Sequence, residues 1–430
     1  MLKRILTLIA GALLGIVLSV GALRMALAWS WFPNRELERS ASYVRDAMKL
    51  VNENYVDKEN VDYDRLAREA IHGLVESLDP HSEFMESSDF EQLQDDLDGD
   101  FGGIGIQVEM RKGRVIVIAP IAGTPGERAG ILRGDEILGV EGRMLGAESG
   151  MEDVIKLLRG KPNTQVTLSL YRPSTQKKQE FTLVREVIKL QSVRDVSVLE
   201  GHIGYIQLTE FSAHTGHEFT NALDGLLKQG IDGLVLDLRN NPGGLLESAV
   251  EVAEPFFRTD ELVVYTQGRK PEDRENFLAE LEGEPIALPM VVLINAGSAS
   301  AAEVVTGALK DTGRAVIVGE RSFGKGSVQS IIKLKNGEGL RLTTARYYTP
   351  SGVSIHGKGI APQVEVVMTP EEDNKLRLQR GRTDIKDPVE FNERFGFVPI
   401  DDRQLHAALD VLKGVAVFEA RAHGEAPSNP

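Results

Sequence analysis

Ser300 and Lys325 are the two side chains best placed to do chemistry together. Ser300 lies in a run of small residues between an apolar strand predicted at 289–294 and a helical pattern that follows. Its Ser-x-x-Glu spacing to Glu303 is that of a capping box, which predicts a helix start and gives Glu303 no chemistry of its own. A serine there lies at the positive end of a helix, beside backbone N–H groups that no helical carbonyl satisfies.

Lys325 stands between Gly324 and Gly326, after a second apolar strand predicted at 315–318. Neighbouring side chains can bury an ammonium at such a position, and burial lowers the pKa of a lysine towards that of a usable base. A serine at a strand-to-helix turn and a desolvated lysine can therefore act as nucleophile and base without a histidine.

Two other serines, Ser298 and Ser327, compete with Ser300 for the role of nucleophile. Position alone leaves Ser298 and Ser300 close, because both belong to the predicted turn. The capping spacing to Glu303 favours Ser300.

A second strand-to-helix junction carries the glycine pair Gly243 and Gly244. It follows a strand predicted at 233–238 and precedes a helix predicted at 245–253. Two glycines at such a junction let backbone N–H groups face an anion. A plain turn is the alternative interpretation, and the Ser300 motif is what favours anion binding.

These motifs resemble those of the C-terminal processing peptidases, a family of serine proteases with a Ser/Lys dyad. The matching runs are 298–303, 319–320 and 323–329. The resemblance implies that Ser300 is the nucleophile, Lys325 the general base and Gln329 the residue that orients the lysine. It also implies an oxyanion hole built from the backbone of three residues: Gly243, Gly244 and Ala301.

The segment 99–187 resembles a PDZ domain over its full length. Its signature is a Pro-x-x-x-Ala-Gly-(x)3-Gly-Asp-x-Ile pattern that begins at Pro125. The resemblance places the loop that receives a peptide's terminal carboxylate at four residues: Gly103, Ile104, Gly105 and Ile106. The strand after this loop would then pair with the peptide by β-augmentation.

The strand–helix–strand order that leads up to the glycine pair indicates an α/β core. The whole chain is expected to be an α/β (α+β) multidomain protein, and the resemblance implies a ClpP/crotonase-like protease core. The expected parts are a signal peptide or N-terminal anchor (1–28), a helical N-terminal region (35–95), the inserted β-rich PDZ domain (99–187), the protease core (188–368), a C-terminal linker and helix (369–422) and a disordered tail (423–430). The highly charged stretch 370–388 is expected to be the linker.

Composition and the N-terminus restrict the compartment and the partners. The 430 residues carry a net charge of −15, which argues against nucleic acid, and no cysteine, which excludes disulfides and thiolate metal sites. Lys3 and Arg4 precede an uncharged stretch at 5–23, and an Ala-x-Ala site at 26–28 favours a removed signal peptide over a retained anchor. Either one predicts an exported protein, in the periplasm or anchored to the inner membrane.

The predicted function is that of a serine endopeptidase that needs no metal, ATP or other cofactor and cuts envelope proteins near their C-termini. The expected partners are protein substrates bound by their C-termini, an adaptor protein and further copies of the chain, held through the helical terminal segments. Contact with the membrane is expected only through an uncleaved N-terminus. The glycine-rich run 319–326 lacks the Ser or Thr that a phosphate-binding loop carries after its lysine. The alternative function is that of a catalytically silent, PDZ-bearing envelope scaffold.

Overall fold

The computed structural model describes residues 19, 21, 24, 35–111, 113–146, 150–334, 336–380, 382, 385 and 387–422. Most of the predicted signal segment and the predicted tail at 423–430 lie outside the described residues. Within the described part of the chain, no helix is long and apolar enough to cross a membrane. The chain divides into two compact units, Met1–Phe84 and Met85–Pro430.

The first unit contains the helices α2 (Arg35–Asn54) and α3 (Tyr63–Glu76), joined through the short 3-10 helix η1 (Lys58–Asn60). The carboxylate of Asp62 caps α3 by accepting a hydrogen bond from the backbone N–H of Arg65, at 2.9 Å. The region is helical, as its apolar spacing predicts. The strand β1 (Glu83–Met85) spans the boundary between the two units.

A six-stranded, mostly parallel sheet forms the centre of the second unit, in the order β10-β11-β12-β15-β16-β19. Only the pair β10–β11 is antiparallel. The strands are β10 (Val193–Leu199), β11 (Ile203–Leu208), β12 (Gly233–Asp237), β15 (Met290–Ile294), β16 (Val316–Gly319) and β19 (Val364–Glu365). Every residue of β12 and β15 is buried, which explains why both read as unbroken apolar runs.

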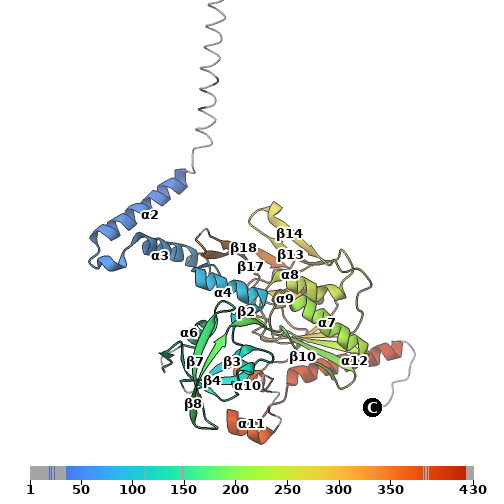
Figure 1. Cartoon of the computed structure of the whole chain (residues 1–430). Helices are drawn as coiled ribbons and strands as arrows, with labels where there is room; N and C mark the ends of the chain where they lie inside the picture. Colours follow the sequence, from blue (N-terminus) through green and yellow to red (C-terminus); the bar gives the residue numbers. More distant parts are fainter. Residues whose placement is uncertain are drawn as a thin grey trace, which may run out of the picture. The chain divides into compact units, whose positions relative to one another are not determined.

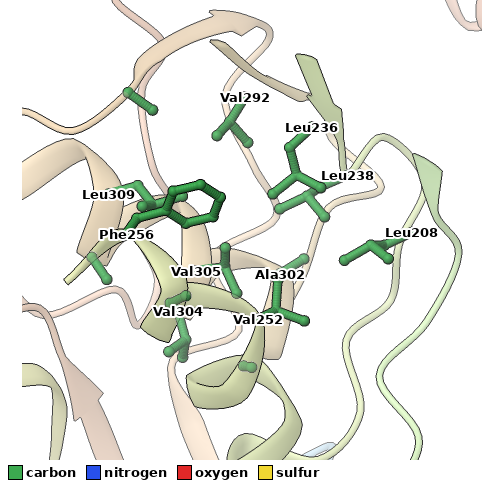
Figure 2. Packing of buried hydrophobic residues seen from close by; sticks show 14 of the residues in the cluster. Leu208, Leu236, Leu238, Val252, Phe256, Val292, Ala302, Val304, Val305 and Leu309 are labelled. Atoms are coloured by element: carbon green, nitrogen blue, oxygen red, sulfur yellow. The ribbon is translucent and has the colours of Figure 1, made fainter. Parts of the chain in front are cut away.

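One face of this sheet is covered by α7 (Thr215–Lys228), α8 (Leu246–Ala253) and α9 (Ala301–Asp311). Figure 2 shows part of this core, in which the side chains of Leu236 and Val292 lie on the face of the sheet that the helices cover. Strands β12 and β15 place successive side chains on opposite faces, so a second core must form on the other side.

The opposite face is covered by α12 (Arg403–Ala422). Its residues Ala408 and Leu412 pack against Val291 and Leu293, which alternate with the residues of the first core. The second unit therefore contains a three-layer α/β structure, which confirms the predicted fold class.

A group of antiparallel strands adjoins this layer structure in the second unit, with β14, β13, β18 and β17 as neighbours in that order. The strands are β13 (Leu262–Gln267), β14 (Arg274–Leu278), β17 (Ser327–Lys333) and β18 (Gly339–Tyr348). The 3-10 helix η2 (Glu254–Phe256) precedes β13 in the chain, and η3 (Pro271–Asp273) lies between β13 and β14. This group matters for the site because β17 begins two residues after Lys325.

The PDZ-like module is built from two small sheets and two helices. Its strands are β2 (Asp100–Gly103), β3 (Ile106–Arg111), β4 (Arg114–Pro120), β5 (Glu136–Val140), β6 (Arg143–Met144), β7 (Gln165–Arg172), β8 (Lys177–Val184) and β9 (Glu186–Lys189). The larger sheet has the order β3-β4-β5-β7-β8, so β3 is an edge strand; its strands run from teal (β3 and β4) to green (β7 and β8) in Figure 1. The helices are α5 (Pro125–Arg128) and α6 (Met151–Leu158), and α4 (Ser87–Asp98) precedes the module.

The C-terminal segment differs from the prediction. Part of the stretch expected to be a linker forms α10 (Pro370–Arg380), and α11 (Pro388–Phe395) begins where that stretch ends. In α10 only Leu376 is fully buried, so the helix has no apolar stripe that a sequence pattern could show. Acidic residues in its first turn and basic ones in its last stabilise it through the helix dipole.

Candidate functional site

Ser300 lies at a sharp turn between β15 and α9. Its backbone has φ +53° and ψ −118°, a conformation that costs a non-glycine residue on the order of 1–3 kcal/mol. The loop after β12 helps to hold this turn, because the N–H of Ala299 donates to the carbonyl of Asn241 at 2.9 Å. Such a turn presents a short side chain at the start of a helix, where the first N–H group of α9, that of Ala301, has no partner among the described residues.

The two competing serines have other contacts. The Ser298 hydroxyl is fully buried, donates to the carbonyl of Leu238 at 2.7 Å and accepts from the N–H of Asn295 at 3.0 Å. The Ser327 hydroxyl accepts a hydrogen bond from the side chain of Gln329 at 3.2 Å. Both serines therefore hold neighbouring backbone or side chains in place.

Glu303 connects the Ser300 turn to the lysine loop. Its carboxylate is fully buried and accepts four hydrogen bonds. The donors are the N–H groups of Ser300 (2.9 Å), Lys325 (2.8 Å) and Gly324 (2.7 Å) and the hydroxyl of Ser322 (2.5 Å). Burial raises the pKa of Glu303, and these hydrogen bonds oppose the rise. The prediction of a helix-start residue is thus incomplete, because the same carboxylate also positions the loop of Lys325.

Replacing Glu303 by glutamine should loosen both loops at once. The amide puts an NH₂ group where one oxygen accepts, so buried donors lose their partner at a cost of about 1–3 kcal/mol each. We expect a lower free energy of unfolding in urea and slower labelling of Ser300 by a fluorophosphonate. The control is Glu371→Gln, on the exposed side of α10. Unchanged labelling of a folded Glu303→Gln protein would contradict this role.

Lys325 is half-buried in the loop that joins β16 to β17. Burial lowers the pKa of Lys325, and the nearby positive charge of Arg341 lowers it further. Within the described part of the chain, the Lys325 ammonium makes no hydrogen bond, and its backbone N–H is the group that Glu303 binds. The lysine thus has the environment of a base, but the structure does not join it to Ser300.

Gln329 does not contact Lys325 by a hydrogen bond. Its side-chain nitrogen donates to the hydroxyls of Ser327 and, at 2.9 Å, Thr343. Its carbonyl oxygen is buried without a partner among the described residues. This oxygen is an unused acceptor, which suits an amine or ammonium donor.

Tyr347 is a neighbour of Ser300 that the sequence analysis missed. Its phenol is buried, and burial raises the pKa of Tyr347 to about 12, while the neighbouring side chain of Ser300 opposes the rise. Its backbone N–H donates to the carbonyl of Gly326 at 2.9 Å, next to Lys325. The alternation of β18 could have shown only that Tyr347 and Tyr348 face opposite sides, since Tyr348 stacks on Tyr265.

The glycine pair lies directly against the Ser300 turn. A Cβ atom on Gly243 would meet the Cβ of Ser300 at 2.7 Å and the backbone nitrogen of Ala301 at 2.8 Å. The N–H of Gly243 already donates to the side chain of Asn241, at 2.9 Å. Among the described residues, the N–H groups of Gly244 and Ala301 have no partner. Of the predicted oxyanion donors, these two are the ones free to bind an anion.

The four predicted peptide-binding residues of the PDZ module line one cavity of about 260 Å³. They are Gly103, Ile104, Gly105 and Ile106. Ile155 and Leu158 of α6 line the same cavity and make it apolar. In the described part of the chain, the N–H groups of Ile104 and Gly105 have no partner, and β3 is an edge strand. The cavity can therefore hold an apolar side chain beside a carboxylate.

No group of three or more metal-ligating side chains occurs among the residues that the structure describes. The fold and the site together define an α/β peptidase core with a PDZ domain. A model of peptidase family S41 matches residues 202–366, and a PDZ-domain model matches residues 102–183.

Relatives of known description agree with both matches. The chain is 36% identical to a carboxy-terminal-processing protease of Bartonella bacilliformis, over 96% of each chain. It is 34% identical to the carboxy-terminal processing protease CtpB of Bacillus subtilis, over 90% of this chain and 78% of that protein. A solved S41 protease structure from Bacteroides fragilis shares the fold, with a TM-score of 0.50 and 17% identity over 86% of this chain and 97% of the other. The chain belongs to peptidase family S41, and it is a serine peptidase of the carboxy-terminal processing protease type.

Proposed function

We propose that this peptidase cuts exported bacterial proteins near their C-termini, with Ser300 as nucleophile and Lys325 as general base. The observation that carries the proposal is the buried Glu303 carboxylate, which ties the backbone of Ser300 to that of Lys325. Two loops distant in sequence are thereby held side by side, with a strained serine on one and a half-buried lysine on the other. Such an arrangement is that of a nucleophile and its base.

In the proposed reaction, the neutral amine of Lys325 takes the proton from Ser300 as the oxygen attacks the scissile carbonyl. The N–H groups of Gly244 and Ala301 stabilise the oxyanion of the tetrahedral intermediate. The Lys325 ammonium then protonates the departing amine, which leaves an acyl-enzyme on Ser300. Water, deprotonated by Lys325, releases the new C-terminus and regenerates the serine.

The contacts of the structure fit a resting form of this site. The side chain of Ser300 lies beside the buried phenol of Tyr347, while the buried carbonyl oxygen of Gln329 has no partner among the described residues. We assign this arrangement to the resting enzyme, and a Ser300–Lys325–Gln329 chain of hydrogen bonds to the enzyme that holds substrate. The unpaired oxygen of Gln329 supports this assignment, because a buried acceptor without a donor is costly to keep.

Substrate capture is assigned to the PDZ cavity. The free N–H groups of Ile104 and Gly105 would bind the terminal carboxylate of a substrate, and Ile155 and Leu158 would contact an apolar C-terminal side chain. The edge of β3 would pair with the residues before it. Protein substrates with polar or amidated C-termini should accordingly be poor ones.

We propose that the protein is exported, because the uncharged N-terminal stretch and the Ala-x-Ala site would direct the peptidase domain to the periplasm.

We also propose that copies of the chain associate through the terminal helices, because α2 and α3 keep large apolar side chains exposed, among them Tyr43, Leu50 and Leu74. An adaptor protein that delivers substrates remains part of the same proposal.

A catalytically silent scaffold is the competing function, and the lack of a Ser300–Lys325 hydrogen bond is the observation that favours it. The purified full chain should degrade unfolded casein and should bind a fluorophosphonate at Ser300, whereas Ser300→Ala should do neither. Both proteins should bind a peptide with a free apolar C-terminus equally well. If the wild type leaves casein intact and its serine is unlabelled while the peptide still binds, the scaffold function replaces the peptidase mechanism.

A further inference from the structure

The C-terminal segment after β19 contacts the ends of three strands of the central sheet. β12 ends just before the glycine turn, β15 just before the Ser300 turn, and β16 just before the lysine loop. These are the three loops that the proposed mechanism uses. None of the contacts made there by the C-terminal segment belongs to that mechanism.

At the end of β12, a cluster of charges with a fully buried centre joins the sheet to α10 and α12. Asp237 forms ion pairs with Arg239 at 2.7 Å and with Arg380 of α10 at 2.5 Å. Arg239 also pairs with Asp402, just before α12, at 2.7 Å. The positive charges of both arginines hold the pKa of Asp237 below its usual range against the effect of burial.

At the end of β15, Asn295 fixes the Ser300 turn and the glycine turn to each other. Its side-chain oxygen accepts hydrogen bonds from the N–H groups of Gly297, at 3.1 Å, and Asn240, at 2.9 Å. Its amide nitrogen donates to a carboxylate oxygen of Asp373 on α10, at 3.0 Å. The side chain of Asn240 donates to the same oxygen at 3.4 Å. Asp373 therefore orients Asn295 so that its oxygen faces both turns.

At the end of β16, Glu320 makes the third contact. Its carboxylate accepts from the backbone N–H of Met368 at 2.8 Å and from the side chain of Gln404 at 3.3 Å. Glu320 is followed at once by the loop that carries Lys325. The three contacts together make the C-terminal segment a common support for all three loops.

We propose that Asp373 is a positioning residue of the peptidase site, acting through Asn295 on the Ser300 turn and on the glycine turn. This inference rests on the proposed function. Ser300 has a backbone conformation that is costly on its own, so the turn keeps it only while the surrounding contacts determine it. A charge-assisted hydrogen bond is among the stronger of such contacts. Without Asp373, the amide of Asn295 is free to rotate, and its oxygen no longer fixes the two turns.

The experiment exchanges the donor and the acceptor of this contact. Asn295→Asp keeps the oxygen that binds Gly297 and Asn240 but faces Asp373 with a second carboxylate. We expect kcat on casein to fall at least about tenfold, with KM unchanged, and fluorophosphonate labelling of Ser300 to slow to the same extent. The double variant Asn295→Asp with Asp373→Asn restores one donor and one acceptor, and it should recover most of the activity.

A second variant and a control keep the test decisive. Asp373→Leu has a similar shape but no acceptor, so it should also lose activity. It serves as the test of this contact if Asn295→Asp does not fold. Glu371→Ala changes an exposed residue in the first turn of α10, and this variant should behave as wild type. Binding of a C-terminal peptide to the PDZ domain should be unchanged in all variants.

The outcomes separate this inference from the proposed function. An active wild type whose Asp373→Leu and Asn295→Asp variants match Glu371→Ala overturns the positioning role but leaves the mechanism intact. Absence of rescue in the double variant also overturns it. A wild type that neither cuts casein nor reacts at Ser300 overturns the proposed function first.

Discussion

Replacing Lys325 by alanine should reduce kcat by about 10²–10⁴-fold, because the reaction loses its general base. The matched variant is Lys325→Arg, which keeps the positive charge and most of the length but cannot become neutral near physiological pH. If Lys325 acts as a base, arginine should be as inactive as alanine. Steady-state cleavage of casein measures both, with circular dichroism to show that the fold persists. An arginine variant with near wild-type activity would assign Lys325 an electrostatic role instead.

The pH profile tests the same base in the wild-type enzyme. Burial and the charge of Arg341 lower the pKa of Lys325, which favours the neutral, active amine. The value of kcat/KM should therefore rise with pH and level off once pH exceeds this lowered pKa. Arg341→Gln removes one of the two causes, so the pKa should rise and the profile should move to higher pH. A shift to lower pH, or a flat profile, would contradict general-base catalysis by Lys325.

Much of the central fold could be predicted because it depends on local patterns. The buried strands β12 and β15 read as apolar runs, and the capping spacing at Glu303 marks the start of α9. The PDZ module was predicted from a resemblance, and its cavity brings together the four residues that were expected to bind peptide. In each case the residues that decide the structure are close in the sequence.

The features that the sequence does not predict depend on contacts between residues that are distant in the chain. α10 has one fully buried side chain, and its contacts to the sheet are the polar ones of Asp373 and Arg380, which no periodicity reveals. The second role of Glu303, as acceptor for the lysine loop, requires the folded chain. The same holds for the contact of Tyr347 with Ser300, since nothing in an alternating strand indicates which residue its side chain meets.

Replacing Gly243 by alanine should impair catalysis without a large effect on the rest of the molecule. The new Cβ would lie 2.7 Å from the Cβ of Ser300 and 2.8 Å from the nitrogen of Ala301, so it would intrude where the oxyanion is expected to bind. The backbone of Gly243 also has φ +98°, which a side chain rarely adopts. The new Cβ would block access to the N–H of Ala301. Because loss of one oxyanion donor typically costs about 10²–10³ in kcat, we expect a loss of that size here.

The matched control is Gly225→Ala, in the last turn of α7, where a Cβ atom meets nothing within 4 Å. Alanine should stabilise that helix by about 0.4–1 kcal/mol and leave kcat unchanged. Casein cleavage, fluorophosphonate labelling and thermal unfolding should be measured on both variants, together with binding of a C-terminal peptide to the PDZ domain. Retention of full kcat by Gly243→Ala would show that the oxyanion binds elsewhere. A loss of kcat with peptide binding intact would place the damage at the junction of Gly243, Ser300 and Ala301, because the PDZ cavity shares none of these residues.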